Sequence, residues 1–126
     1  MLVIGAGKIG FQHVLGAIDS GFEEIFVLDP YVSDEIRSKL ERLGKVRFTD
    51  RLIEVSKSIT HVIIATSSNV RFYYLSKCVD SFPKLEFLLL EKFLFNDQKH
   101  YTDAKVLESS NPHIKFRVNC SKRYIP

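Results

Sequence analysis

Residues 2–10 read LVIGAGKIG, a short apolar run that leads directly into three glycines. Gly5, Gly7 and Gly10 form the pattern G-x-G-x-x-G. After Gly10, small or apolar residues recur every three or four positions up to residue 18, which indicates that the third glycine opens an amphipathic helix. The segment therefore predicts a strand, a tight turn and a helix, in that order.

Each of the three glycines has its own physical reason in such a segment. Gly5 permits the tight turn, Gly7 lets a pyrophosphate approach the backbone, and Gly10 lets the helix pack closely on the strand. The free N–H groups and partial positive charge at the start of a helix favour phosphate. We expect a phosphate site lined by Gly5, Ala6, Gly7, Lys8, Ile9 and Gly10.

Asp29 comes directly after the next apolar run, residues 24–28. A carboxylate at the end of the second strand accepts hydrogen bonds from the ribose of adenosine and repels a 2′-phosphate. Pro30 and Tyr31 follow it, and neither can bind a 2′-phosphate as the positive charge of an arginine would. The sequence therefore predicts a dinucleotide site that prefers NAD to NADP. The alternative interpretation is that the glycines serve only the turn and the packing, and that no cofactor binds.

Strand-like and helix-like segments alternate along the chain. The expected strands are residues 2–4, 24–28, 46–48, 59–65, 85–90 and 114–118. The expected helices are residues 10–20, 33–43, a brief helix at 51–57, then 69–82 and 97–108, the last capped by Asn96. Continuous apolar strands are buried on both faces, which is typical of a parallel sheet covered by helices, whereas the last strand alternates like a half-exposed edge strand.

This pattern predicts an α/β domain with a doubly wound parallel sheet, which is the Rossmann fold. We expect six strands in the order 3-2-1-4-5-6 with helices on both faces, and residues 1–126 as one dinucleotide-binding domain.

Composition excludes several classes of protein. Of the 126 residues, 45% are hydrophobic and 26% charged, which is the balance of a globular domain. The net charge is only +3 with scattered Lys and Arg, so we expect no nucleic-acid partner. The apolar runs are too short to span a membrane. Cys78, Cys120 and the histidines lack metal-ligand spacing, so we expect no metal and a reduced, cytoplasmic chain.

Three further segments point to one family. Residues 63–69 read IIATSSN, residues 90–93 read LEKF and residues 118–124 read VNCSKRY. With the glycine loop, they resemble the N-terminal NAD-binding domain of the Gfo/Idh/MocA oxidoreductases, the glucose-fructose oxidoreductase and inositol dehydrogenase family, along the whole chain. The Glu91–Lys92 pair, which resembles the E-K-P signature of the family, is the most specific part. The nearest branch is one linked to surface-sugar biosynthesis.

The resemblance implies roles for the matched residues only. Thr66, Ser67 and Asn69 would line the nicotinamide and its ribose, and Glu91 would lie along the cofactor. Lys92 would be catalytic, close to the nicotinamide and the substrate hydroxyl, where its charge polarises a carbonyl or stabilises an alkoxide.

The sequence departs from the family pattern at three points. Phe93 replaces the proline of the signature, and Arg71 stands where the family often has a histidine. We expect Arg71 to be solvated or to touch phosphate or substrate, and His13 to be a packed or half-exposed helix residue. The C-terminal substrate domain of the family is also absent, so we expect a homo-oligomer, with exposed apolar groups at Phe93, Phe95, Tyr124 and Ile125.

The resemblance implies an oxidoreductase that transfers hydride between NAD(H) and a sugar-like or polyol substrate. We expect residues 1–126 alone to be inactive. The alternative is a non-catalytic NAD(H)-sensing regulatory module, like the domains attached to potassium channels and transporters. Such a module shares the glycine loop and the acid but has no need for the Glu91–Lys92 pair.

Overall fold

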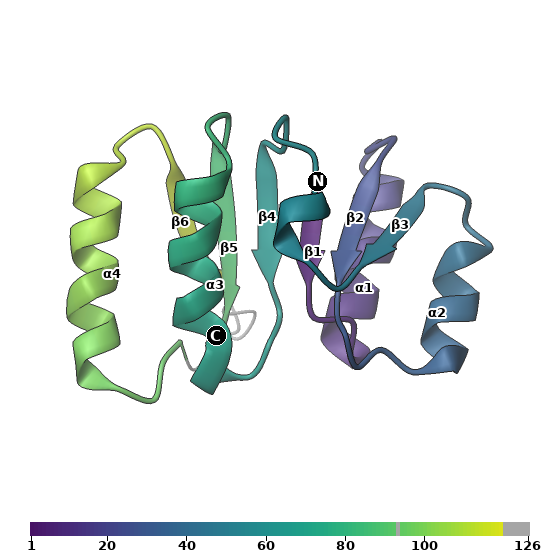
Figure 1. The fold of residues 1–126 in the computed structure, drawn as a ribbon, viewed down its shortest axis with the longest axis horizontal. Helices are drawn as coiled ribbons and strands as arrows, with labels where there is room; N and C mark the ends of the chain where they lie inside the picture. The colour runs from purple at the N-terminus through teal and green to yellow at the C-terminus, as the bar shows by residue number, and fades with distance from the viewer. Residues whose placement is uncertain (93, 120–126) are drawn as a thin grey trace, which may run out of the picture.

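The computed structural model describes residues 1–92 and 94–119, within which strands and helices alternate (Figure 1). The strands are β1 (Leu2–Ile4), β2 (Ile25–Leu28), β3 (Val46–Thr49), β4 (His61–Ile64), β5 (Phe87–Glu91) and β6 (Lys115–Asn119). The helices are α1 (Lys8–Asp19), α2 (Asp34–Glu41), the single 3₁₀ turn η1 (Leu52–Glu54), α3 (Ser68–Ser81) and α4 (Gln98–Ser110).

The six strands form one parallel sheet in the order β3-β2-β1-β4-β5-β6, which confirms the predicted topology. At its centre, Val3 of β1 pairs with Val27 of β2 on one side and with Ile63 of β4 on the other. Because all strands run the same way, their carboxyl ends lie at one edge of the sheet, the lower edge in Figure 1. The chain reverses its direction of winding between β1 and β4, and such a reversal opens a crevice at that edge.

Two apolar layers explain why the central strands are continuously hydrophobic. Ile4, Leu28 and Ile64 face the layer that contains α3, α4 and η1. The alternate positions Val3 and Val27 face the layer that contains α1 and α2. The edge strand β6 has no fully buried residue, as its alternating sequence predicted.

The N-terminal capping residue was predicted correctly for α2, but the start of α4 and the extent of η1 were not. Ser33 caps α2, where its hydroxyl accepts the N–H of Ile36 at 3.2 Å. The predicted cap of α4, Asn96, is wrong: Asp97 is the cap and accepts the N–H of Lys99 at 2.8 Å. The helix expected over residues 51–57 is only the short turn η1.

The prediction of an exposed apolar patch is wrong at Phe95, which is its one residue within the described part of the chain. Phe95 is only 7% exposed and its ring packs edge-on against Phe72 and Tyr101. Residues 93, 124 and 125 lie outside the described part of the chain.

Cys78 is a buried core residue, as predicted, and burial raises the pKa of its thiol to about 12. Cys120 is not among the described residues. None of the described helices combines the length and apolar character needed to cross a membrane.

Two glycines of α1 give a direct test of how closely this helix packs on the sheet. A Cβ atom on Gly10 would lie 1.8 Å from the carbonyl oxygen of Gly5, so the turn would have to move, whereas a Cβ on Gly16 would meet nothing within 4 Å. Gly10→Ala should lower the free energy of unfolding by about 1–3 kcal/mol. Gly16→Ala should raise it by up to ~1 kcal/mol through helix propensity. Urea unfolding measures both, and a Gly10→Ala variant as stable as the native protein would contradict the close packing.

Candidate functional site

Gly5 and Gly10 are required by the fold itself. Gly5 has φ +94°, and a Cβ there would lie 2.8 Å from the carbonyl oxygen of Ala65. Its N–H donates to the carbonyl of Leu28 at 2.9 Å, which joins the turn to β2. The contact between Gly10 and Gly5 then brings the start of α1 to the carboxyl edge of the sheet.

Gly7 is different, because no part of the described fold needs a glycine there. Its φ is −72°, which any residue adopts, and a Cβ would meet nothing within 4 Å. Gly7 is the N-cap of α1 and is exposed, as are Lys8 and Ile9 after it. No side chain caps this helix and its first turn has no acidic residue. The helix therefore offers an exposed, positively polarised N-terminus with open space above the backbone.

Asp29 joins the end of β2 to the glycine loop. Its Oδ2 accepts the N–H of Ala6 at 2.8 Å and its Oδ1 accepts the N–H of Tyr31 at 2.8 Å. Each carboxylate oxygen has a second lone pair, so both can accept a further hydrogen bond. The carboxylate is thus fixed beside the loop and is not turned away from the sheet edge.

A cleft of about 380 Å³ lies next to Asp29, where the ends of β1, β2 and β4 meet. Its lining residues are Ile4, Leu28, Asp29, Pro30, Tyr31, Ala65, Thr66, Ser67, Val70 and Tyr74. Three predicted site residues, Asp29, Thr66 and Ser67, come together here. Two residues of α3, Val70 and Tyr74, were not predicted, and their spacing of four on the helix after the loop was the available signal. An apolar cleft with a few polar groups suits a nucleoside.

The hydroxyl-rich loop between β4 and α3 is held by its own side chains. The Thr66 hydroxyl donates to the carbonyl of Ser67 at 3.1 Å, and the Ser67 hydroxyl donates to the side-chain oxygen of Asn69. The Ser68 hydroxyl donates to Asn96 at 2.7 Å. Asn69 is exposed and does not line the cleft.

The structure buries Glu91 and exposes its neighbour Lys92. Glu91 is 7% exposed, and its Oε1 lies 2.6 Å from Nε2 of His13 and accepts Nδ2 of Asn119 at 2.9 Å. Burial alone would raise the pKa of Glu91, but hydrogen bonds from Asn119 and His13 outweigh it and hold the pKa below its ordinary value. Glu91 therefore links α1, β5 and β6 as a carboxylate, whereas Lys92 is exposed at the end of β5.

His13 is half-buried on α1, as predicted, but its partner was not foreseen. His13 follows the buried Gly10 by three positions and precedes the buried Ala17 by four, so it lies on the inward face of the helix. This spacing was the signal for an inward-facing polar group. The partner Glu91 is 78 positions away, and nothing local identifies it.

Arg71 is corrected from a solvated to a buried residue, with 4% of its surface exposed. Its guanidinium donates to the carbonyls of Lys92 at 3.3 Å and Leu94 at 3.2 Å, and also to the carbonyl of Thr66. Arg71 precedes Leu75 and Cys78, the other buried residues of α3, by one and two helical turns, so its position on the inward face was visible in the sequence.

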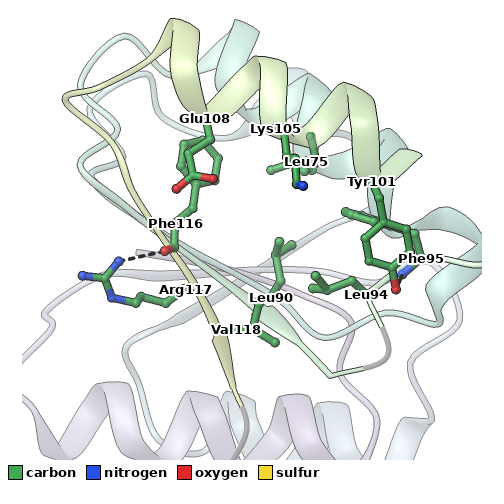
Figure 2. A pocket seen from close by; sticks show the side chains of 11 residues that line it. Leu75, Leu90, Leu94, Phe95, Tyr101, Lys105, Glu108, Phe116, Arg117 and Val118 are labelled. Carbon is green, nitrogen blue, oxygen red and sulfur yellow. Dashed lines mark hydrogen bonds between the residues drawn. The ribbon is translucent and has the colours of Figure 1, made fainter. Parts of the chain in front are cut away.

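A second cavity, of about 230 Å³, lies between α4 and strands β5 and β6 (Figure 2). Leu90, Phe116 and Val118 of the sheet face it from one side and Tyr101 of α4 from another. None of the predicted site residues lines it. Within residues 1–92 and 94–119, no three His, Cys, Asp or Glu side chains gather as a metal site would require.

The ionised state of Glu91 predicts an acid-dependent stability. Because its pKa is lowered in the folded state, its stabilising contribution is complete above the unfolded-chain pKa of about 4.3 and is lost as the pH falls through the lower folded pKa. Glu91→Gln should therefore be less stable than the native protein at pH ~7, and the difference should shrink on acidification below about pH 4. Urea unfolding as a function of pH measures this.

Glu86→Gln is the matched control, because Glu86 is exposed just before the same strand. It should change the unfolding free energy little at any of these pH values. A Glu91→Gln difference that stays constant as the pH falls would contradict an ionised Glu91.

No protein-family model and no curated protein sequence matches the chain. Solved structures do match. The chain superposes on UDP-N-acetylglucosamine 3-dehydrogenase from Acidithiobacillus ferrooxidans with a TM-score of 0.77 and 17% identity, covering 99% of this chain and 39% of that one. For myo-inositol 2-dehydrogenase from Lactobacillus plantarum the TM-score is 0.81 at 17% identity, covering 98% of this chain and 36% of that one.

A third match is the WlbA dehydrogenase from Chromobacterium violaceum, solved in complex with NADH and UDP-GlcNAcA. Its TM-score is 0.77 at 17% identity, covering 98% of this chain and 35% of that one. The chain thus spans little more than a third of the length of these relatives. It has the fold of the N-terminal NAD-binding domain of the Gfo/Idh/MocA dehydrogenases, as the sequence resemblance predicted.

Proposed function

We propose that the chain binds NAD(H) along the carboxyl edge of its sheet, as the cofactor-binding domain of an oxidoreductase. The observation that carries this proposal is Gly7. The fold explains the other two glycines of the motif, whereas Gly7 leaves open space directly at an exposed helix N-terminus, where a ligand can approach the backbone. A pyrophosphate is the group that this arrangement favours.

The adenosine half of the cofactor lies in the cleft beside Asp29. The pyrophosphate rests on the loop Gly5–Gly10, with Ala6, Lys8 and Ile9 between the glycines, and the ribose hydroxyls donate to the remaining lone pairs of Asp29. The negative charge of Asp29 repels a 2′-phosphate, so NAD is preferred to NADP. The support for this placement is that the loop and the acid are already joined through Ala6.

The nicotinamide half lies toward β4 and β5, near Thr66, Ser67 and Asn69. When bound, the nicotinamide supplies hydride or accepts it. Lys92 is the proposed catalytic residue, since its exposed ammonium group follows the end of β5 and would stabilise negative charge on a substrate oxygen. Glu91 shapes this end of the site from within, through its contacts with His13 and Asn119.

For the whole enzyme we propose hydride transfer to or from a sugar-like or polyol carbon. The names of the matched structures, a UDP-sugar dehydrogenase and an inositol dehydrogenase, support this substrate class. Because the chain spans little more than a third of those relatives, we assign the substrate contacts to a second domain and expect residues 1–126 alone to be inactive. A non-catalytic NAD(H)-sensing module would use the same loop and acid but would not need Lys92.

Gly7→Ala tests this function without disturbing the fold. The backbone at Gly7 accepts alanine and the methyl group meets no protein atom, so the free energy of unfolding should change by less than ~1 kcal/mol. The methyl group would occupy the space that the pyrophosphate needs, so NADH affinity should fall by about tenfold or more, roughly 1.4 kcal/mol. Calorimetric titration and urea unfolding measure the two quantities.

Gly16→Ala, on the exposed side of the same helix, is the control and should bind NADH like the native protein. NADPH should bind the native protein more weakly than NADH because of Asp29. Native protein that gives no signal at ~1 mM NADH would refute the function, since a dissociation constant far above that value means no useful site. If Gly7→Ala bound NADH with native affinity, the glycine loop would not be part of the binding site.

A further inference from the structure

Arg71 connects the two loops that form the proposed nicotinamide end of the site. We infer that Arg71 is a positioning residue: its guanidinium fixes the backbone at Thr66 and at Lys92 in one arrangement and so sets where the Lys92 side chain begins. The inference rests on the proposed function, because it concerns the same site. It adds a residue that is not among those lining the cleft beside Asp29.

The backbone around Lys92 needs such a partner because the sheet ends just before it. The pairing of β4 with β5 ends at Ile64 and Leu90, and Glu91 is the last residue of β5. Within residues 1–92 and 94–119, no backbone N–H donates to the carbonyl groups of Thr66 or Lys92. Carbonyl groups that are partly shielded from water are stabilised by a hydrogen bond, and here Arg71 donates it.

Arginine suits this place better than any other cation. Its planar guanidinium carries five N–H donors in a fixed geometry, so one side chain reaches carbonyls on two segments, Thr66 before α3 and Lys92 with Leu94 after β5. A lysine ammonium is a compact charge without this planar set of donors. Because Arg71 is 4% exposed, water cannot replace the lost contacts.

Glu91 holds the same turn from the other face of the sheet. Its carboxylate is bound by His13 and Asn119 on the side of α1, while Arg71 holds the carbonyl of the next residue from the side of α3. Lys92 thus follows a residue anchored on one face and is itself anchored on the other. The turn that presents its side chain is restrained from two directions, and this restraint lets an exposed lysine act at a defined point.

The two halves of the proposed cofactor depend on different residues of the site. The adenosine half depends on the glycine loop and Asp29, whose contacts involve neither Arg71 nor Lys92. Thr66 lines the cleft at the boundary between the two halves, and only the nicotinamide half also depends on Lys92, whose backbone carbonyl Arg71 holds. A change at Arg71 should therefore weaken the binding of NADH and spare ADP-ribose, which has the adenosine half and both phosphates but no nicotinamide.

The experiment compares the dissociation constants of NADH and ADP-ribose for native protein, Arg71→Lys and the control Arg42→Lys, by calorimetry. Arg42 is exposed at the end of α2, far from both loops in the fold. Native protein should bind NADH more tightly than ADP-ribose. Arg71→Lys should lose about tenfold in NADH affinity, as expected for the loss of hydrogen bonds from a charged donor, and stay within about twofold for ADP-ribose. Arg42→Lys should match the native protein for both ligands.

Two results would overturn the positioning role. The first is an Arg71→Lys variant that loses affinity equally for both ligands or for neither, since a merely structural role predicts this. The second is native protein that binds NADH and ADP-ribose equally well. Native protein that binds neither ligand would instead overturn the proposed function, and this inference with it. If circular dichroism finds Arg71→Lys unfolded, Arg71→Gln takes its place with the same expected and contrary results.

Discussion

The close contact between α1 and the turn after β1 is the constraint on which the rest of the structure depends. The Cα of Gly10 lies so near the carbonyl of Gly5 that no side chain fits between them, and Gly5 itself lies against the carbonyl of Ala65. These two contacts bring the start of α1 to the carboxyl ends of β1 and β4, where the chain reverses its direction of winding. The free N–H groups of the helix then open onto the crevice of the sheet, which is where parallel α/β sheets bind their ligands.

The two sides of this crevice are held by different means. On the side of β2, Asp29 joins the glycine loop to the strand end through two backbone N–H groups, so its carboxylate is oriented before any ligand arrives. On the side of β5, a buried cation and a buried anion hold the turn, with Arg71 on one face and Glu91 on the other. Buried charges are stable only when their hydrogen bonds are satisfied, so each of them fixes the groups that it contacts.

Much of the fold was predictable from the sequence, and the reasons are local. The apolar runs at β1 and β4, the glycine pattern and the cap Ser33 are each contained in a few neighbouring residues. The hydrogen bonds from Arg71 to Lys92 and the contact of His13 with Glu91 were not predicted, because each joins segments that are distant in the chain and meet only in the folded sheet. The cap of α4 was misplaced by one residue, since Asn96 and Asp97 are adjacent and both are good capping residues.

In the proposed site, the backbone at the start of α1 receives the pyrophosphate. Amide NMR during an NADH titration tests it most directly, because every N–H group of the loop reports separately. The largest shift changes should occur at Gly7, Lys8 and Ile9, with further changes at Thr66. Changes confined to the apolar cavity under α4, at residues such as Tyr101 and Phe116, or an unperturbed glycine loop at saturating NADH, would contradict it.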